Sequence, residues 1–202
     1  MPYNTIQPPF TLKFREMSNQ EIKDYYQWFL SVFLQRINEL ANAVKESQGF
    51  EAWQPDYTAA SLDTLGNWFA TQAEARQRTQ EERQEVASRS PYPIEIPEGE
   101  LTSRTFSLAM DVGIYFSQVL VKEHPSLHWE QPLNDKKFAD YGQPVLVGFG
   151  PVPLNPVRIL VTLAYGLVSK TQGGKRLREL HDYWSKQVRT THAGTANIRG
   201  KT

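Results

Sequence analysis

The chain has 202 residues, of which 40% are hydrophobic and 12% aromatic, and it has no cysteine. This composition predicts a globular fold and excludes disulfides, thiolate nucleophiles and cysteine-ligated zinc. Residues 1–100 hold 9 Lys+Arg and 15 Asp+Glu, and residues 101–202 hold 13 and 7, so the halves carry −6 and +6. The opposite charges predict attraction between the halves, within the molecule or between two copies. The positive charge of the second half is too small to predict a nucleic-acid-binding surface.

The sequence also predicts where the protein works. No apolar run reaches the roughly 20 residues that a bilayer requires, so we expect no membrane-spanning helix. The N-terminal stretch MPYNTIQPPF lacks the basic flank and the apolar core of a secretory signal. Together with the absence of cysteine, these features predict a cytoplasmic protein.

The N-terminal part of the chain predicts an extended arm and then a long helix. Residues 1–16 contain paired prolines and the alternating run FTLKF, so we expect an extended arm with at most one short strand. Ser18 and Glu21 have the spacing of a capping box, and an apolar stripe in steps of three and four then runs to Val44. We expect one continuous central helix that ends at Gly49.

A second helix is predicted from near Thr58, and a charged stretch follows it. The stretch EARQRTQEERQEVASRS has almost no apolar residues, so it is a solvated extension of that helix or, if Thr79 and Glu82 form a capping box, a separate short helix. The segment SPYPIEIPEGE then separates two halves, with three prolines around a short extended IEI.

The second half predicts a helix, a β-hairpin and two further helices. A helix over residues 103–123 is stopped by Pro125, and Gly113 within it indicates close packing against another helix. The runs LHWEQ and PVLVGFG are rich in strand-forming residues and predict the hairpin. Asn155 and Pro156 start the helix VRILVTLAYGLV, which is apolar on nearly every side and is expected to be deeply buried. After two glycines, a final amphipathic helix is expected to turn inward Leu177, Leu180, Tyr183, Trp184 and Val188.

These elements predict an α+β fold that is mainly α-helical, with a small antiparallel β-hairpin or sheet in the second half. We expect a single globular domain over residues 1–190, made of a helical part (18–90) and a helix–hairpin–helix part (101–188), and a disordered tail at 191–202. The proline-rich segment 91–97 separates two domains or crosses one core. A single domain is favoured, because a helical hairpin alone would leave the aromatic residues of the first helix exposed to water.

Few residues carry recognisable catalytic or ligand chemistry. His124 and His128 are four apart, but Pro125 between them breaks the helix that a metal pair would need, so no metal site is predicted. No nucleophile motif such as G-x-S-x-G occurs. Asp111 interrupts an apolar helix and needs a partner such as Arg104 or Arg158, either as a structural pair or as a functional carboxylate in a pocket.

Two loops are candidate binding elements. Gly173 and Gly174 precede Lys175 and Arg176 at a helix start, where an anion could bind, although we favour a turn between two packed helices, which explains the glycines without a ligand. The loop NDKKFADYGQPV projects from the hairpin next to Trp129 and offers Lys136, Lys137, Asp140 and Tyr141. Alternatively, Phe138 and Tyr141 fold down onto the helices, and Asp140 and Gly142 make the turn into the strand.

Four runs resemble bacterial proteins of an uncharacterised family: FSLAMDVGIYFSQVLV, HPSLHW, KKFADYGQPVLVGFG and PLNPVRILVTLAYGL. The resemblance covers about the second half of the chain and implies no activity and no site residue. The helix, hairpin, helix order also looks like small immunity proteins that are paired with bacterial toxins, but only at the level of fold.

These observations favour a non-enzymatic bacterial protein that binds a partner protein, as an immunity protein binds a toxin. Its expected partner-binding residues are Trp129, Lys136, Lys137, Asp140 and Tyr141. The alternative is a small-molecule or anion-binding protein, with enzymes included, that has a pocket near Asp111 and Arg158 and uses Lys175 and Arg176. We expect no cofactor, metal, nucleic acid or membrane, and the charge split leaves a homodimer open.

Overall fold

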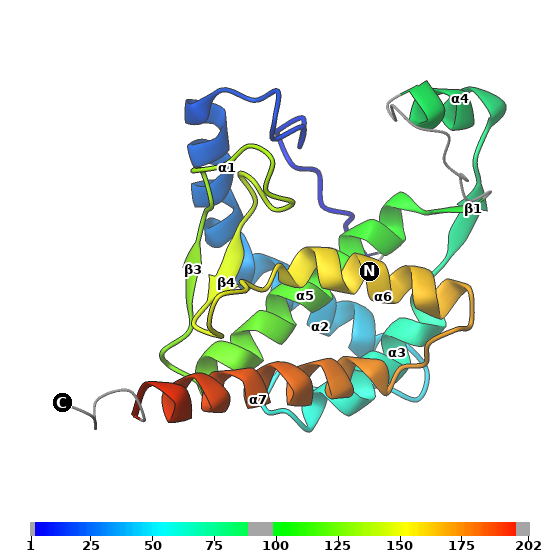
Figure 1. The fold of residues 1–202 in the computed structure, drawn as a ribbon. Helices are drawn as coiled ribbons and strands as arrows, with labels where there is room; N and C mark the ends of the chain where they lie inside the picture. Colours follow the sequence, from blue (N-terminus) through cyan, green and yellow to red (C-terminus); the bar gives the residue numbers. More distant parts are fainter. Residues whose placement is uncertain (1–2, 89–98, 197–202) are drawn as a thin grey trace.

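In the computed structural model, the chain forms a helical body from which two small ribbons of strands extend (Figure 1). The structure describes residues 3–88 and 99–196, and for 189–196 it describes the backbone alone. The helices are α1 (Asn19–Ser31), α2 (Phe33–Lys45), α3 (Ser61–Gln72), α4 (Gln80–Ser88), α5 (Ser103–Glu123), α6 (Pro156–Val168) and α7 (Arg176–Ala196). The strands are β1 (Ala75–Gln77), β2 (Gly99–Leu101), β3 (His128–Glu130) and β4 (Val145–Val147). The predicted class, α+β and mainly helical with a small sheet in the second half, is confirmed.

The central helix is α5, which contacts α2, α3, α6 and α7. It has the bounds that the sequence predicts, and the Thr102 hydroxyl caps it by accepting a hydrogen bond from the Thr105 amide at 3.2 Å. Gly113 marks the crossing with α6, as expected, because a β-carbon there would lie 3.0 Å from the Pro156 carbonyl oxygen. The two helices therefore approach closely enough to exclude any side chain at this position.

The predicted long first helix is two helices. The capping box of Ser18 and Glu21 starts α1 as expected, but the helix ends at Ser31 and α2 begins after Val32. Neither Pro nor Gly stands at the break, so the sequence gives no signal for it. The break accompanies tertiary contacts, since Phe33 packs on Trp129 of the hairpin with ring centres 5.5 Å apart.

The charged stretch after α3 forms a projecting ribbon and a separate helix. Strands β1 and β2 pair antiparallel, Ala75 opposite Leu101, and this ribbon was not predicted. The side chain of Thr79 and that of Glu82 bond each other's backbone amides, so the short separate helix is confirmed as α4. No residue of α4 is buried, and the helix stands away from the body (Figure 1). The predicted IEI segment lies outside the described residues.

The predicted hairpin of the second half is confirmed. Strand β3 pairs antiparallel with β4, with Trp129 opposite Leu146, and Leu146 forms an isolated bridge with Leu154. The loop between the strands turns back at Gly142, whose φ of 73° favours glycine.

The last two helices depart in part from the prediction. Asn155 caps α6 as expected, but α6 is not deeply buried all round: the residues of its outer side are only partly buried. On α7, Tyr183 is 57% exposed instead of inward-facing. Helix α7 also extends to Ala196, past the predicted domain end at residue 190, and residues 197–202 lie outside the described residues.

One cluster of buried side chains draws on both halves of the chain, from Met17 to Val188. The N-terminal arm lies over this body, and residues 3–16 form no strand, where we expected at most one. In the ranges 3–88 and 99–196, no helix combines the length and the apolar character needed to cross a bilayer.

Candidate functional site

A buried polar hub surrounds Asp111 in the middle of α5. Both of its carboxylate oxygens accept hydrogen bonds from Arg36 of α2, at 2.8 Å from Nε and 2.7 Å from Nη2. The Tyr3 hydroxyl donates to the same carboxylate and lies 2.7 Å from the Ser107 hydroxyl. Burial raises the pKa of Asp111 to about 6, although the hydrogen bonds and the charge of Arg36 oppose this.

The hub corrects our expectations for Asp111. Its partner is Arg36 and not Arg104 or Arg158, because the side of α5 that carries Asp111 faces α2. Asp111 is fully buried and bonded within the protein, so its carboxylate does not line an open pocket with Arg158 in this structure. Arg158 instead pairs with Asp140 at 2.9 Å. The hub therefore ties the arm, α2 and α5 together.

Two of the loop residues that we predicted to bind a partner are buried. Asp140 is 2% exposed and accepts a hydrogen bond from the Asn155 side chain at 2.8 Å. Tyr141 is 4% exposed and folds down onto the body, as in our second interpretation of the loop, whereas Phe138, for which that interpretation expected the same, is only partly buried. Gly142 turns the chain there with its φ of 73°, and its lack of a side chain also leaves room for the arm, because a β-carbon would lie 3.2 Å from Phe14.

The other predicted loop residues have mixed positions. Trp129 is half-buried, and its ring packs edge-on to Phe29 at 5.3 Å, so it holds the hairpin against α1 and α2. Its indole N–H finds no acceptor among the described residues. Lys136 and Lys137 are exposed, and the ammonium of Lys136 lies 5.9 Å from the centre of the Tyr141 ring. Only the two lysines are well placed for a partner.

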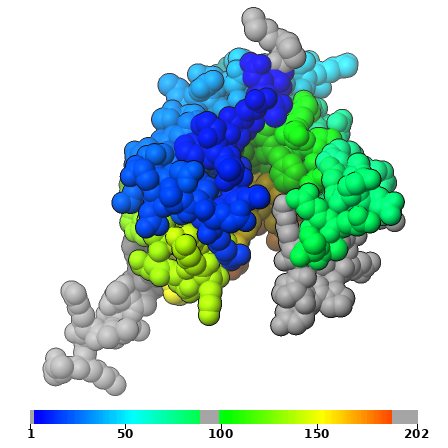
Figure 2. Space-filling model, turned by 90° about the horizontal axis from the view of Figure 1, so that it is seen from above, coloured from blue at the N-terminus to red at the C-terminus, as the bar shows by residue number. Residues whose placement is uncertain are grey.

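The exposed lysines stand beside a depression that sequence reasoning missed. We name it the arm–loop hollow; its volume is about 290 Å³, and it lies where the N-terminal arm meets the hairpin loop. The two segments lie side by side on one face of the molecule (Figure 2). It is lined by Leu12, Lys13, Phe14, Arg15, Glu16, Phe138, Ala139, Tyr141 and Gln143.

The hollow has an apolar base and a basic rim. Phe14, Phe138 and Tyr141 supply the aromatic surface, and Lys13 and Arg15 contribute exposed cations. Arg15 is held by a hydrogen bond from its Nε to the Lys136 carbonyl at 2.9 Å, which leaves its terminal nitrogens available. Leu12 at the rim is 42% exposed and has a φ of 57°, a conformation that is costly for a leucine.

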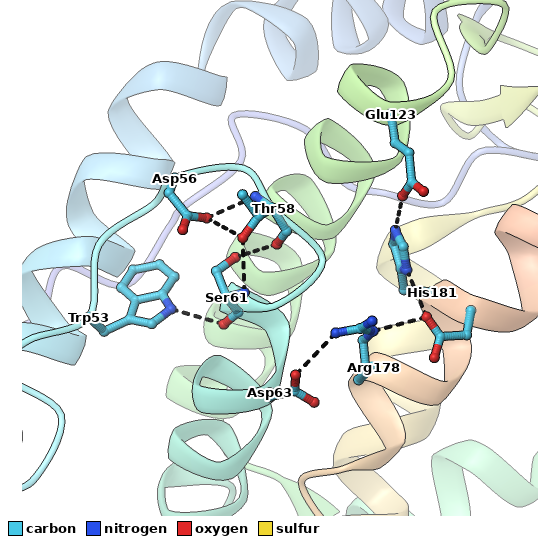
Figure 3. A network of polar contacts seen from close by, with 9 residues as sticks. Trp53, Asp56, Thr58, Ser61, Asp63, Glu123, Arg178 and His181 are labelled. Carbon is cyan, nitrogen blue, oxygen red and sulfur yellow. Dashed lines mark hydrogen bonds and ion pairs between the residues drawn. The ribbon is translucent and has the colours of Figure 1, made fainter.

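A second polar network joins α3, α5 and α7 (Figure 3). His181 is 2% exposed, and its two ring nitrogens lie 2.8 Å from a Glu123 oxygen and 3.2 Å from an Asp182 oxygen. Arg178 bridges Asp182 at 2.9 Å and Asp63 of α3 at 3.1 Å. Partial burial acts to raise the pKa of Asp182, but hydrogen bonds from Arg178 and His181 lower it overall.

This network does not have the arrangement of a catalytic site. Ser185 lies 3.5 Å from His181 Nε2, but Glu123 is closer to the same nitrogen and already satisfies it. The three helices are cross-linked by these contacts, which favours a structural role. Within the described part of the chain, no three His, Asp or Glu side chains are grouped to hold a metal ion.

Lys175 and Arg176, which our alternative hypothesis assigned to anion binding, are exposed at the start of α7. Arg176 forms an ion pair with Glu179 at 3.0 Å and also lines a groove between α6 and α7. Lys175 does not line this groove.

Comparisons with protein-family models, curated proteins and solved structures find no match to this chain. The family and the fold relationship that the sequence suggests therefore remain predictions. A function can be proposed only from the arrangement of the residues in the structure.

Proposed function

We propose that the protein is a non-enzymatic, cytoplasmic binding protein whose arm–loop hollow holds an acidic segment of a partner protein. The observation that carries the proposal is the combination of an aromatic base with a rim of exposed cations. A volume of about 290 Å³ suits one large side chain, and an anchoring residue in such a pocket supplies much of the affinity of many interfaces.

Charge determines the kind of partner. Lys13 and Arg15 line the hollow together with the acid Glu16, and Lys136 and Lys137 directly precede its lining residue Phe138 in the loop. With Asp135 counted as well, the two acids offset only half of the charge of the four cations. Lys137 forms no ion pair with a described residue, and the Lys13–Glu16 pair is loose, at 3.6 Å between exposed groups. A negatively charged segment with a central aromatic or leucine side chain therefore complements both the rim and the base.

The proposal is tested with a peptide in which one phenylalanine is flanked by glutamate and aspartate. Amide shifts in a ¹⁵N NMR titration should change at Leu12–Glu16 and 136–143. The double variant Arg15→Glu/Lys137→Glu should weaken binding about tenfold, which corresponds to about 1.4 kcal/mol. Lys45→Glu, which reverses an exposed cation of α2 outside the hollow, should leave affinity unchanged.

Peptide controls separate charge from shape. Replacing the phenylalanine by serine should weaken binding, and replacing the acids by lysines should abolish it. Shift changes elsewhere on the molecule, or equal binding of the lysine peptide, would rule out the hollow as the acidic-peptide site.

A second copy of this chain is another acidic partner to test, because its first hundred residues carry −6. Sedimentation at low and at high salt measures this directly, since association driven by charge weakens as salt increases. A dimer that persists in Arg15→Glu/Lys137→Glu would place the contact elsewhere.

A further inference from the structure

Several apolar side chains of α6 are only partly covered by the rest of the protein. Although α6 is apolar around most of its circumference, Ile159, Val161, Tyr165 and Val168 are only partly buried. Such a helix is normally covered on all sides, because each Å² of apolar surface left in water loses about 25 cal/mol of stabilising free energy. Of these residues, Ile159 and Tyr165 line a groove between α6 and α7, whereas the exposed residues of α6 are the polar Arg158 and Thr162.

The α6 wall of this groove is formed by Ile159, Thr162, Leu163, Tyr165 and Gly166, and the groove has a volume of about 610 Å³. This volume lies within the range of roughly 300–1,000 Å³ that is common for small-molecule sites. Ile159, Leu163 and Leu180 supply apolar walls from both helices. The hydroxyls of Ser169 and Thr171 lie at the turn between the helices, beside Arg176. The groove is thus apolar along the helices and polar at the end where they join.

Arg176 makes this polar end cationic. It is the first residue of α7, so the partial positive charge of the helix N-terminus adds to its own. Its partner Glu179 is 59% exposed, and an ion pair between exposed groups contributes little, so an incoming carboxylate can replace Glu179. Lys170 and Lys175 are exposed on the same turn and add to the positive field.

We propose that the α6–α7 groove binds an apolar chain that ends in a carboxylate, of the fatty-acid class. The carboxylate would take both terminal nitrogens of Arg176, a geometry that suits guanidinium. The apolar chain would lie along Ile159 and Leu180 and cover the apolar wall of the groove. This site is separate from the arm–loop hollow, so neither proposal depends on the other.

The test is calorimetric titration of the full chain with decanoate below its critical micelle concentration. We expect one decanoate per chain. Arg176→Gln should weaken binding about tenfold, the loss of a charge-assisted hydrogen-bonded pair. Lys175→Gln removes the neighbouring cation that does not line the groove, and it should change affinity less than twofold. Thr162→Trp, at an exposed residue that lines the groove, should block binding, with circular dichroism to confirm the fold.

Three outcomes would overturn the proposal. Equal affinity for decanol would show that the groove does not recognise the carboxylate. An equal loss of affinity for decanoate in Arg176→Gln and Lys175→Gln would show that the overall positive charge of the turn, and not Arg176 itself, attracts the carboxylate. Absence of decanoate binding, together with a dimer that Thr162→Trp dissociates in sedimentation, would assign the groove to a second copy of the chain.

Discussion

Arg36 and Asp111, 75 residues apart in the sequence, form a bidentate ion pair inside the body. Arg36 is 4% exposed and Asp111 is fully buried. The pair runs against the overall charge split, because the cation comes from the acidic half and the anion from the basic half. The Tyr3 hydroxyl and the Asn4 carbonyl accept further hydrogen bonds from Arg36, at 2.8 and 2.9 Å. The pair therefore fixes the N-terminal arm, which forms one side of the arm–loop hollow.

Removing one member of this pair should destabilise the fold strongly. Asp111→Ala leaves the guanidinium of Arg36 buried without its counter-charge, which costs about 3–5 kcal/mol of unfolding free energy. The double variant Arg36→Met/Asp111→Leu replaces both charges by apolar groups and should recover much of that loss. Urea unfolding followed by tryptophan fluorescence measures both. A double variant no more stable than Asp111→Ala would contradict this account.

The same carboxyl should make stability depend on pH. Burial raises the pKa of Asp111 to about 6 in the folded protein, above its ordinary value of 3.8. Its contribution to stability is therefore fully present below pH 3.8 and is lost as the pH rises through 6. The difference in unfolding free energy between the natural protein and Asp111→Asn should fall by about 2 kcal/mol from pH 4 to pH 7. A difference that stays constant over this range would show that the pKa is not raised.

Local elements could be predicted where their signals are adjacent in the sequence. Ser18 with Glu21, Thr79 with Glu82, and Asn155 with Pro156 each start a helix, and each pair lies within four residues. The hairpin followed from strand-forming runs on either side of a polar loop. The break at Val32 could not be predicted, because neither Pro nor Gly stands there, and the contact between Phe33 and Trp129 that accompanies it joins residues far apart in the sequence.

The candidate site was harder to predict because its contacts join distant residues. The loop was identified, but burial of Asp140 depends on Asn155 and Arg158 of the next helix. Arg15 reaches the loop across 121 residues, and no local pattern indicates such a contact. The ribbon of β1 and β2 was missed for the same reason, since its strands are polar and their pairing is not local.

Close packing at Gly113 should make this position intolerant of side chains. A β-carbon would lie 3.0 Å from the Pro156 oxygen and 3.2 Å from the Val157 α-carbon, and backbone atoms cannot move aside as a side-chain end would. Gly113→Val should therefore cost about 1–3 kcal/mol, more than the gain of under 1 kcal/mol in helix propensity. Gly173→Ala, which meets no atom within 4 Å, should stay within about 0.5 kcal/mol. Thermal unfolding of the two variants gives the comparison, and equal stabilities would refute close packing.

The network around His181 should divide into a part that stabilises the fold and a part that does not (Figure 3). His181 is buried, so His181→Ala leaves a cavity beside Phe116 and removes the link to Glu123, at a cost of about 2–3 kcal/mol. Arg178 is 34% exposed and Asp63 53%, so Arg178→Ala should cost under about 1 kcal/mol despite its two ion pairs. Denaturant unfolding at low and high salt distinguishes the two. The loss of stability in His181→Ala should hardly change with salt, because it comes from burial and not from a screened surface charge. A loss in Arg178→Ala larger than that in His181→Ala would instead show that the ion pairs of Arg178 stabilise the contact between α3 and α7.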